Sequence, residues 1–357
     1  MIVPTMKDTV GIKKIAELSG VSIGTVDRVI NNRSGVSKKT AKHVNAVIKH
    51  TGYKKNNVAS RLKLAKSKSI SISVLFPKEA YLEDHYWHLP LLGVQKAVAE
   101  LKEMGISHEL FVFDISNKKS FKRASQQILK NATNAIITVP FFADECQSLR
   151  EQADALNIPI VYIDTKHDVN QEQNYFISQN SLQSGKVAGR ILYQIIKDRG
   201  NYLVFNLINN NTETQKNNLE RESGFKSFFE EEVPNFKPNI LLITADDSKI
   251  NSLEKKLLAF KKDHTSLGIF VTNSRAYLLP KILEKIGLAA QSTLIGYDLN
   301  PRNIELLREN KIQFIINQKP EFQGYSAVKG LFKFLTEQED EELNHTIPVE
   351  VILKENL

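Results

Sequence analysis

The sequence has almost no cysteine and no long apolar run, and each absence excludes a class of protein. Cys146 is the only cysteine among 357 residues, so neither an internal disulfide nor a cysteine-rich zinc site can form. No stretch of about 18 apolar residues occurs, and the first residues lack the apolar segment of a secretory signal. We therefore expect a cytoplasmic protein that has no membrane partner.

Sequence patterns of catalysis and cofactor binding are also missing. There is no glycine-rich loop of the kind that cradles phosphates, and the histidines show no metal-ligand spacing. Glu220 and Glu222 are predicted on opposite faces of one helix, and the acidic pair at 246–248 is better explained as a helix cap. We predict that the chain is not an enzyme and uses no cofactor and no metal ion.

What the sequence does have is a very uneven charge. The net charge is +8, but residues 1–68 hold fifteen Lys and Arg against three Asp and Glu, a net +12, which leaves −4 for residues 69–357. A basic segment joined to a mildly acidic one indicates a polyanionic partner for the basic segment alone. A merely solvated basic surface is the plainer alternative, and only the residue pattern decides between them.

Hydrophobic spacing predicts three short helices in this basic segment. The first ends at Gly20, and Ser22 and Ser37 are suited to cap the second and third, which stop near Asn31 and Gly52. Their apolar faces are Ile12, Ile15 and Ala16; Val26, Val29 and Ile30; and Ala41, Val44, Val47 and Ile48. Two short helices joined by a glycine-bearing turn, with a third closing the core, form a helix-turn-helix.

The second of these helices packs by its apolar side, so only its first turn and outer side can meet DNA. Arg28 suits a guanine edge or a phosphate, Thr25 a phosphate, and Ile23 a thymine methyl group. Asp27 would repel phosphate. It either accepts from a cytosine amine or orients Arg28 through an ion pair, and we favour the ion pair.

The segment GIKKIAELSGVSIGTVDRVINNRSGVSKKTAKHVNAVIKHTGY, with NNVASRLKLAKS after it, resembles the DNA-binding domain of the LacI/GalR family of bacterial transcription regulators. The resemblance implies a hinge helix at about 57–64 that folds on operator DNA and wedges Leu62 into the minor groove. Packing of Leu62 on a dimer mate is compatible with this. The sequence departs from the family at Lys55, Gly24 and Asp27. The predicted DNA contacts are Ser22, Ile23, Gly24, Thr25, Asp27, Arg28, Asn31, Ser37, Asn56, Asn57, Ala59, Arg61 and Leu62.

From residue 69 the hydrophobic period changes to that of strands alternating with helices. The predicted strands are SISISVLF, NAIITVPF, IPIVYID, YLVFNLI, ILLIT, LGIFVT, STLIGYD and QFIINQ, separated by helical stretches such as LGVQKAVAELKEMG. Apolar strands alternating with helices predict parallel sheets covered on both faces. Because 289 residues are too many for a single sheet with its covering helices, we predict two similar lobes. We expect a ligand cleft between them, beyond the carboxyl ends of the strands.

Polar and aromatic residues follow several of these strands. Tyr86 and Trp87 could stack on a sugar ring, or Trp87 could simply fill a lobe edge. Carboxylate, amide and aromatic groups that converge on a cleft suit a neutral polyhydroxylated ligand.

The whole of residues 69–357 also resembles the periplasmic-binding-protein-type effector domain of the same family and ribose-type sugar-binding proteins. The resemblance implies Tyr86, Trp87, Phe141, Asp164, Thr165, Leu219, Asn273, Asp298 and Gln318 as ligand contacts. At Leu219 and Thr165 many relatives carry an arginine. Either Arg221, Lys166 or Arg275 replaces it, or the ligand is less polar than a free pentose.

We thus predict an all-α helix-turn-helix head (residues 1–56), a hinge segment (57–68) and a two-lobed α/β body (69–357). Lobe 1 is predicted at about 69–178 and 319–345, and lobe 2 at about 179–318 and 346–357. The predicted function is that of a homodimeric, nucleoid-associated transcription repressor that binds an inverted-repeat operator in double-stranded DNA and is switched by a carbohydrate effector. Two alternatives stay open, namely a DNA-binding dimer whose body binds no effector and a sugar-binding transport component.

Overall fold

The structure is a computed structural model that describes residues 11–30, 33–53, 69–166, 175–197, 201–208, 216–246, 253–261 and 266–357. The chain divides into two compact units, residues 1–64 and 65–357, so the division falls within the predicted hinge segment. The predicted hinge helix, including Leu62, lies outside the described residues.

The described part of the head contains the three predicted helices, α1 Ile12–Ser19, α2 Ile23–Ile30 and α3 Lys38–Thr51. Gly20 ends α1 in the left-handed conformation (φ 64°), which glycine adopts without steric cost. The Ser22 hydroxyl accepts from the Thr25 N–H at 3.1 Å, and the Ser37 hydroxyl caps α3 in the same way. Both predicted caps are therefore confirmed. Ile15, Val26 and Val44 form the fully buried core that holds the three helices together.

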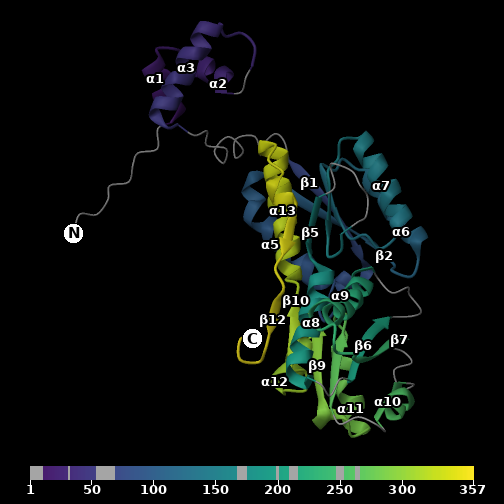
Figure 1. Ribbon diagram of the computed structural model, residues 1–357. Helices are drawn as coiled ribbons and strands as arrows, with labels where there is room; N and C mark the ends of the chain where they lie inside the picture. Colours follow the sequence, from purple (N-terminus) through teal and green to yellow (C-terminus); the bar gives the residue numbers. More distant parts are fainter. Residues whose placement is uncertain are drawn as a thin grey trace, which may run out of the picture. The chain divides into compact units, whose positions relative to one another are not determined.

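Lobe 1 of the body is a six-stranded parallel sheet in the order β11-β5-β4-β3-β1-β2. Its strands are β1 Ile70–Pro77, β2 Ile106–Phe113, β3 Ala135–Thr138, β4 Ile160–Ile163, β5 Tyr175–Gln179 and β11 His345–Ile347. Helices α5 His88–Leu101 and α13 Pro320–Glu337 cover one face, while α6 Lys118–Lys130 and α7 Ala143–Ala155 cover the other (Figure 1). Short 3-10 turns lie at Lys78–Tyr81 (η1), Lys102–Met104 (η2) and Glu341–Leu343 (η7).

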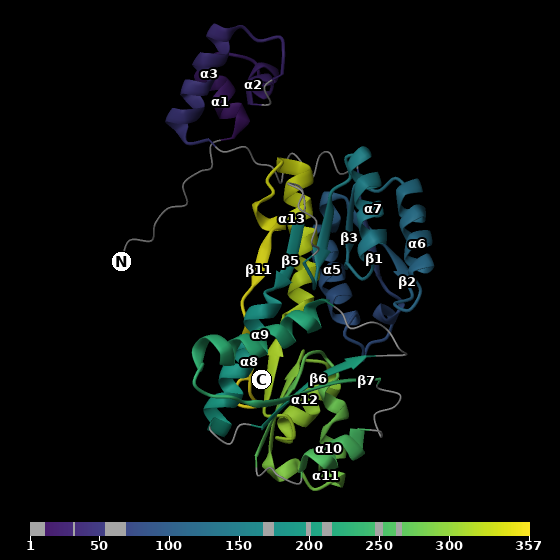
Figure 2. The ribbon, with the colours of Figure 1, turned by 45° about the vertical axis from the view of Figure 1, so that its right-hand side comes forward.

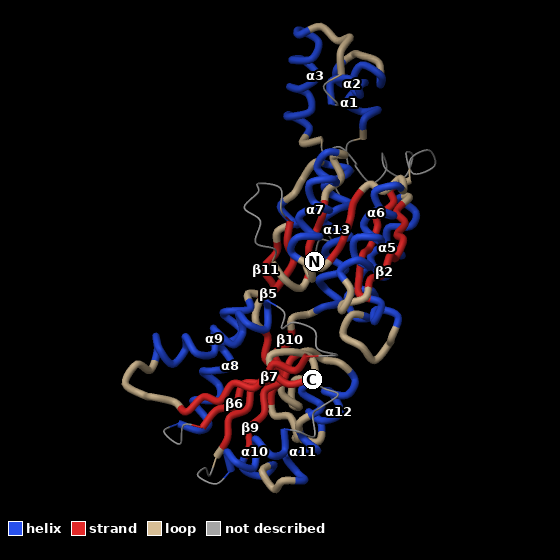
Figure 3. The backbone as a smooth tube through the Cα atoms, turned by 90° about the vertical axis from the view of Figure 1, so that its right-hand side faces the viewer, coloured by secondary structure: helices blue, strands red, loops and turns tan. Residues whose placement is uncertain are grey.

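Lobe 2 repeats this plan in the order β12-β10-β9-β8-β6-β7, with only β12 antiparallel to its neighbour. The strands are β6 Asn201–Ile208, β7 Asn239–Asp246, β8 Leu267–Val271, β9 Ser292–Tyr297, β10 Phe314–Asn317 and β12 Glu350–Ile352. The helices are α8 Ser181–Ile196, α9 Lys216–Glu232, α10 Leu253–Lys261, α11 Pro280–Lys285 and α12 Pro301–Arg308, with 3-10 turns at Ala276–Leu278 and Ala289–Gln291. Figure 3 shows the strands of each lobe as a separate layer flanked by helices.

The two-lobed α/β architecture confirms the prediction, and each of the eight predicted strands is present. Four further strands, β2, β5, β11 and β12, were not predicted. Strand β2 lies at a sheet edge, and its Ser107, His108 and Glu109 dilute the apolar pattern. Strands β11 and β12 have three residues each, too few for any period to show.

Three chain segments cross between the lobes: residues 179–181 from β5 to α8, 317–320 from β10 to α13, and 347–350 from β11 to β12. They leave from neighbouring strands, because β5 pairs with β11 and β10 pairs with β12. Figure 2 shows β5 and β11 side by side in lobe 1, above lobe 2. The three crossover segments therefore lie together and form a single narrow hinge between the lobes.

In each lobe two helices cross at glycines. A Cβ on Gly185 or Gly224 would fall far inside 3.0 Å of a backbone carbonyl of the other helix, and the same holds for Gly93 and Gly324 in lobe 1. Only glycine lets α8 and α9, or α5 and α13, approach this closely. In the described part of the chain, no helix combines the length and apolar composition needed to span a bilayer.

Candidate functional site

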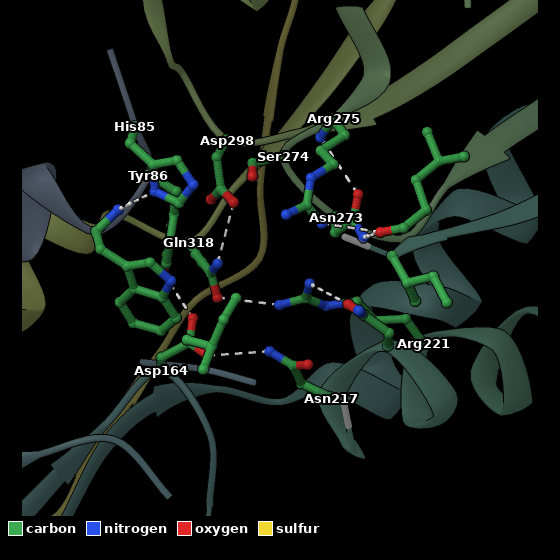
Figure 4. Close-up of a pocket in the computed structure, with 15 residues that line it drawn as sticks. His85, Tyr86, Asp164, Asn217, Arg221, Asn273, Ser274, Arg275, Asp298 and Gln318 are labelled. Atoms are coloured by element: carbon green, nitrogen blue, oxygen red, sulfur yellow. Dashed lines mark hydrogen bonds between the residues drawn. The ribbon is translucent and has the colours of Figure 1, made fainter. Parts of the chain in front are cut away.

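A pocket lined by residues of both lobes lies between the two lobes of the body. Six predicted ligand contacts line it: Tyr86, Trp87, Asp164, Asn273, Asp298 and Gln318. The other lining residues are His85, Ile115, Leu207, Ile208, Asn217, Asn218, Arg221, Ser274 and Arg275. Asp164, Asn273, Asp298 and Gln318 directly follow strands, so the parallel topology brings them together (Figure 4).

Asp164 is held firmly on the lobe 1 side of the pocket. Its φ of 69° is left-handed, and its N–H donates to the Gln323 side-chain oxygen at 2.7 Å. The carboxylate accepts from the Tyr86 hydroxyl at 2.5 Å, from Thr165 at 2.8 Å and from the Asn217 amide at 3.0 Å. Since Asn217 belongs to lobe 2, the last bond joins the lobes across the pocket.

Arg221 projects from α9 into the pocket and is almost fully buried. Its guanidinium donates to the Thr272 carbonyl at 2.7 Å and to the Gln318 side-chain oxygen at 3.0 Å. It also stacks on the Tyr297 ring, with its central carbon 3.8 Å from the ring centroid. The Gln318 amide then donates to Asp298 at 3.2 Å, which links the cation to the second carboxylate of the pocket.

Burial raises the pKa of Asp298 to about 7, opposed by the nearby Arg221 charge and reinforced by Asp164. Burial and Arg275 lower the pKa of His85 to about 4, against a smaller opposite effect of Asp84. His85 is therefore neutral at neutral pH, and its Nδ1 accepts from the Trp87 N–H at 3.4 Å. Both shifts favour the neutral form of the side chain, which suits hydrogen bonding to a ligand without a charge.

Three buried polar atoms of the pocket have no hydrogen-bond partner among the described residues: Asn217 Oδ1, Arg221 Nε and Asp298 Oδ1. Buried polar groups in native proteins are nearly always paired, and leaving one unpaired costs about 1–3 kcal/mol. Two acceptors and one donor on residues that line one pocket match a ligand that carries several hydroxyl groups.

An aromatic cluster closes the lobe 1 side. The Tyr86 and Trp87 rings meet edge to face with centroids 4.8 Å apart, and Phe141 packs against Trp87 at 5.5 Å. Trp87 is only 5% exposed, so it lines the pocket and fills the lobe edge at once. Phe141 packs on the Trp87 ring but does not line the pocket, although it was a predicted ligand contact.

Two predicted contacts lie elsewhere. Leu219 is 48% exposed and does not line the pocket, because the α9 face that points inward carries Asn217, Asn218 and Arg221. Of the three candidate replacements for an arginine, Arg221 and Arg275 line the pocket and Lys166 does not. The Thr165 hydroxyl donates to the Asp164 carboxylate, and Thr165 does not line the pocket. Sequence analysis missed Asn217, Asn218 and His85. The pair Asn217–Asn218, three to four residues before Arg221, was a readable signal because this spacing puts all three on one helix face.

An ion pair bridges the lobes at the pocket mouth. Arg302, on α12, donates to the Asp84 carboxylate at 2.7 Å and lies over the Tyr277 ring at 5.0 Å. Asp84 precedes His85 and Tyr86, so the same lobe 1 segment both lines the pocket and contacts lobe 2.

In the head, the predicted contact residues on α2 are accessible. Ser22, Ile23, Gly24, Arg28 and Ser37 are exposed, and Thr25 and Asp27 are half-buried. Asp27 forms an ion pair with Arg33 at 3.1 Å, a partner that was not predicted, and its ion pair with Arg28 stays a prediction. Arg33 lies just after α2, where its N–H donates to the Arg28 carbonyl at 2.8 Å, which brings its side chain back over that helix. Asn31, Asn56, Asn57, Ala59, Arg61 and Leu62 lie outside the described residues.

Comparison with known proteins matches both parts of the chain. Residues 79–339 match the periplasmic binding protein domain family, and residues 11–56 match the lacI family of bacterial regulatory proteins. The sucrose operon repressor of Streptococcus mutans is 25% identical over 80% of this chain and 81% of its own length. The lactose operon repressor of Escherichia coli is 28% identical over 42% of this chain, and that match spans 39% of the repressor.

Solved structures share the fold of the body. A LacI transcriptional regulator from Bacteroides fragilis, described as putative, is 27% identical with a TM-score of 0.71, over 81% of this chain and 98% of that one. A glucose-galactose binding protein from Geobacillus stearothermophilus is 22% identical with a TM-score of 0.66, over 81% and 99%. A solute binding protein from Actinobacillus succinogenes with bound D-allose is 20% identical with a TM-score of 0.67, over 80% of this chain and 98% of that one.

Proposed function

We infer the function of the chain from the families to which it belongs, the periplasmic binding protein family over its body and the lacI family of bacterial regulatory proteins over its head. From this we propose that it is a transcription repressor whose binding to operator DNA is switched by a small carbohydrate in the pocket between the lobes. Such a role places it in the bacterial cytoplasm with the nucleoid, and its function is binding and not catalysis.

DNA binding is supported by the exposed first turn of α2 and by the charge of the N-terminal segment. Residues 1–68 carry +12, so phosphate contacts and the release of counterions supply affinity for any DNA, while the exposed residues of α2 supply sequence preference. We propose that two copies bind the two halves of an inverted repeat, as a homodimer does with two-fold related half-sites.

The proposal that the pocket binds a carbohydrate rests on three buried atoms without a hydrogen-bond partner among the described residues, Asn217 Oδ1, Arg221 Nε and Asp298 Oδ1. The lining carboxylates Asp164 and Asp298 are balanced by two guanidinium groups, Arg221 and Arg275. A neutral polyhydroxylated ligand satisfies these groups without adding a buried charge. The sugars named for structures of the same fold are of this class.

Switching follows if the ligand binds one lobe arrangement better than the other. The backbone passes between the lobes in the three crossover segments, so closure around a ligand rotates one lobe about this hinge. We propose that this rotation changes the arrangement of the two heads in the dimer and releases DNA. The sign of the response is set by which arrangement binds the ligand more tightly.

A thermal-shift screen of the full chain against pentoses, hexoses, sugar acids, sugar phosphates, disaccharides and nucleobases tests the ligand class. Binding to the folded state alone raises the melting temperature with ligand concentration, so a neutral sugar should produce a saturable rise. A rise with sugar phosphates alone contradicts a neutral ligand. Operator binding without any saturable shift in the panel supports instead a DNA-binding dimer whose body takes no effector.

A further inference from the structure

One glutamine side chain ties the three crossover segments together. Gln179 ends β5 in the first crossover and is 4% exposed. Its amide nitrogen donates to the Asn317 carbonyl in the second crossover at 3.1 Å and to the Pro348 carbonyl in the third at 3.2 Å. Each of these segments must change its backbone angles when the lobes rotate, so any rotation strains or breaks these bonds.

The other end of the same amide contacts the pocket through one residue. The Gln179 oxygen accepts from the Tyr297 hydroxyl at 3.0 Å, and the same hydroxyl of the fully buried Tyr297 also contacts the Ser184 hydroxyl. The face of the Tyr297 ring carries the Arg221 guanidinium at 3.8 Å. Arg221 in turn lines the pocket, and its Nε is buried without a hydrogen-bond partner among the described residues. A continuous path of direct contacts therefore runs from the ligand side of Arg221 to all three crossovers.

We propose that Gln179 is the residue that couples the pocket to the hinge. Its amide clamps the crossovers in the arrangement in which the lobes meet across the pocket, and Tyr297 joins this clamp to the ligand-facing cation. The proposal rests on the proposed function in that the pocket is taken as the ligand site. Beyond the proposed function, it assigns to Gln179 and Tyr297 the transmission of ligand binding in the pocket to rotation of the lobes.

Gln313 offers a matched control. Its side chain also bridges two backbone groups, accepting from the Leu294 N–H at 2.7 Å and donating to the Asn310 carbonyl at 2.7 Å, but entirely within lobe 2. Loss of a bridging amide there removes similar bonds without touching a crossover. Tyr297→Phe is the complementary change, because it keeps the ring under Arg221 and removes only the hydroxyl that reaches Gln179.

The test is the distance between the lobes in the full chain, measured by electron spin resonance with one spin label on each lobe. Lys119 and Lys281 are exposed on α6 and α11, and Cys146 is fully buried, so cysteines at 119 and 281 take the labels. Dilution with unlabelled chain restricts the signal to pairs within one molecule. Circular dichroism and the melting temperature establish that each variant is folded.

Gln179→Met and Tyr297→Phe should each raise the population with widely separated lobes at least threefold over the parent, whereas Gln313→Met should not change it. Unchanged distances in both folded variants overturn the proposal, and an effect of Gln179→Met alone overturns the link to Arg221. If Gln179→Met fails to fold, Tyr297→Phe decides. Since neither ligand nor DNA is present, the result is independent of whether a sugar binds or DNA is released.

Discussion

At the scale of single residues, the pocket depends on ionisable groups that are almost fully buried. Asp298 is 2% exposed, and burial raises the pKa of its carboxyl to about 7 in spite of Arg221 nearby. In the unfolded chain the same group has its ordinary pKa of 3.8. The folded protein therefore keeps a proton between about pH 4 and 7 that the unfolded chain releases, and this group makes stability fall as pH rises through that window.

We predict that Asp298→Asn removes this fall. Three pKa units correspond to a contribution of up to about 4 kcal/mol between the two ends of the window. The free energy of unfolding from urea titrations at pH 4.5, 6 and 8 should decline less in the variant than in the parent chain. Parallel declines in the two proteins would show that Asp298 is already ionised in the folded state.

Arg221 and Leu219 lie two positions apart on α9 but have opposite surroundings. Arg221→Lys keeps the charge but loses Nε and the flat guanidinium stacked on Tyr297, so we expect at least a tenfold loss of affinity for the sugar identified in the thermal screen. Leu219→Ala should change it less than twofold, because Leu219 is half exposed and outside the pocket. Isothermal titration calorimetry measures both. Equal losses would restore Leu219 to the site.

At the scale of helices and strands, the glycine crossing of α8 and α9 fixes where the pocket residues of α9 point. A Cβ on Gly185 would overlap the carbonyl of Arg221 itself, so it must push α9 outward at the pocket. A Cβ on Gly189, one turn further along α8, would lie 3.0 Å from the Phe228 side chain, which can shift slightly.

The two glycines therefore provide a matched pair of alanine substitutions. Gly185→Ala should destabilise the chain by about 1–3 kcal/mol, as overpacking does. Gly189→Ala should be close to neutral, because the helix propensity of alanine, about 1 kcal/mol better than glycine, offsets the tighter packing. Chemical denaturation followed by circular dichroism distinguishes them. A similar loss in both variants would mean that the crossing itself tolerates a methyl group.

The sequence was sufficient to predict elements whose pattern is local. Continuous apolar runs gave the eight strands, and Ser22 and Ser37 fixed the starts of α2 and α3. The edge strand β2 was missed because three of its eight side chains are polar, and the three-residue strands exist only through pairing with distant partners. The α9 residue that lines the pocket is Arg221 and not Leu219, because the helical face is set by the crossing with α8, which no local pattern encodes. Asp27 pairs with Arg33 for a similar reason, since the chain turns back after α2.

At the scale of the whole molecule, the proposed repressor works only if two equilibria share one hinge. The body closes on a ligand, and the heads bind DNA in one arrangement of the dimer. By linkage, a ligand that weakens operator affinity by some factor must itself bind the operator complex more weakly by the same factor. The coupling is therefore a single number, which can be measured from the DNA side.

The most direct test measures that number. An operator selected from random duplexes by the full chain is labelled with fluorescein, and its dissociation constant is measured by anisotropy with and without a saturating sugar from the thermal screen. The account predicts at least a tenfold higher dissociation constant with the sugar, and no such change with Asp298→Ala, whose pocket lacks the carboxylate. A sugar that binds the chain but leaves operator affinity unchanged would contradict the account.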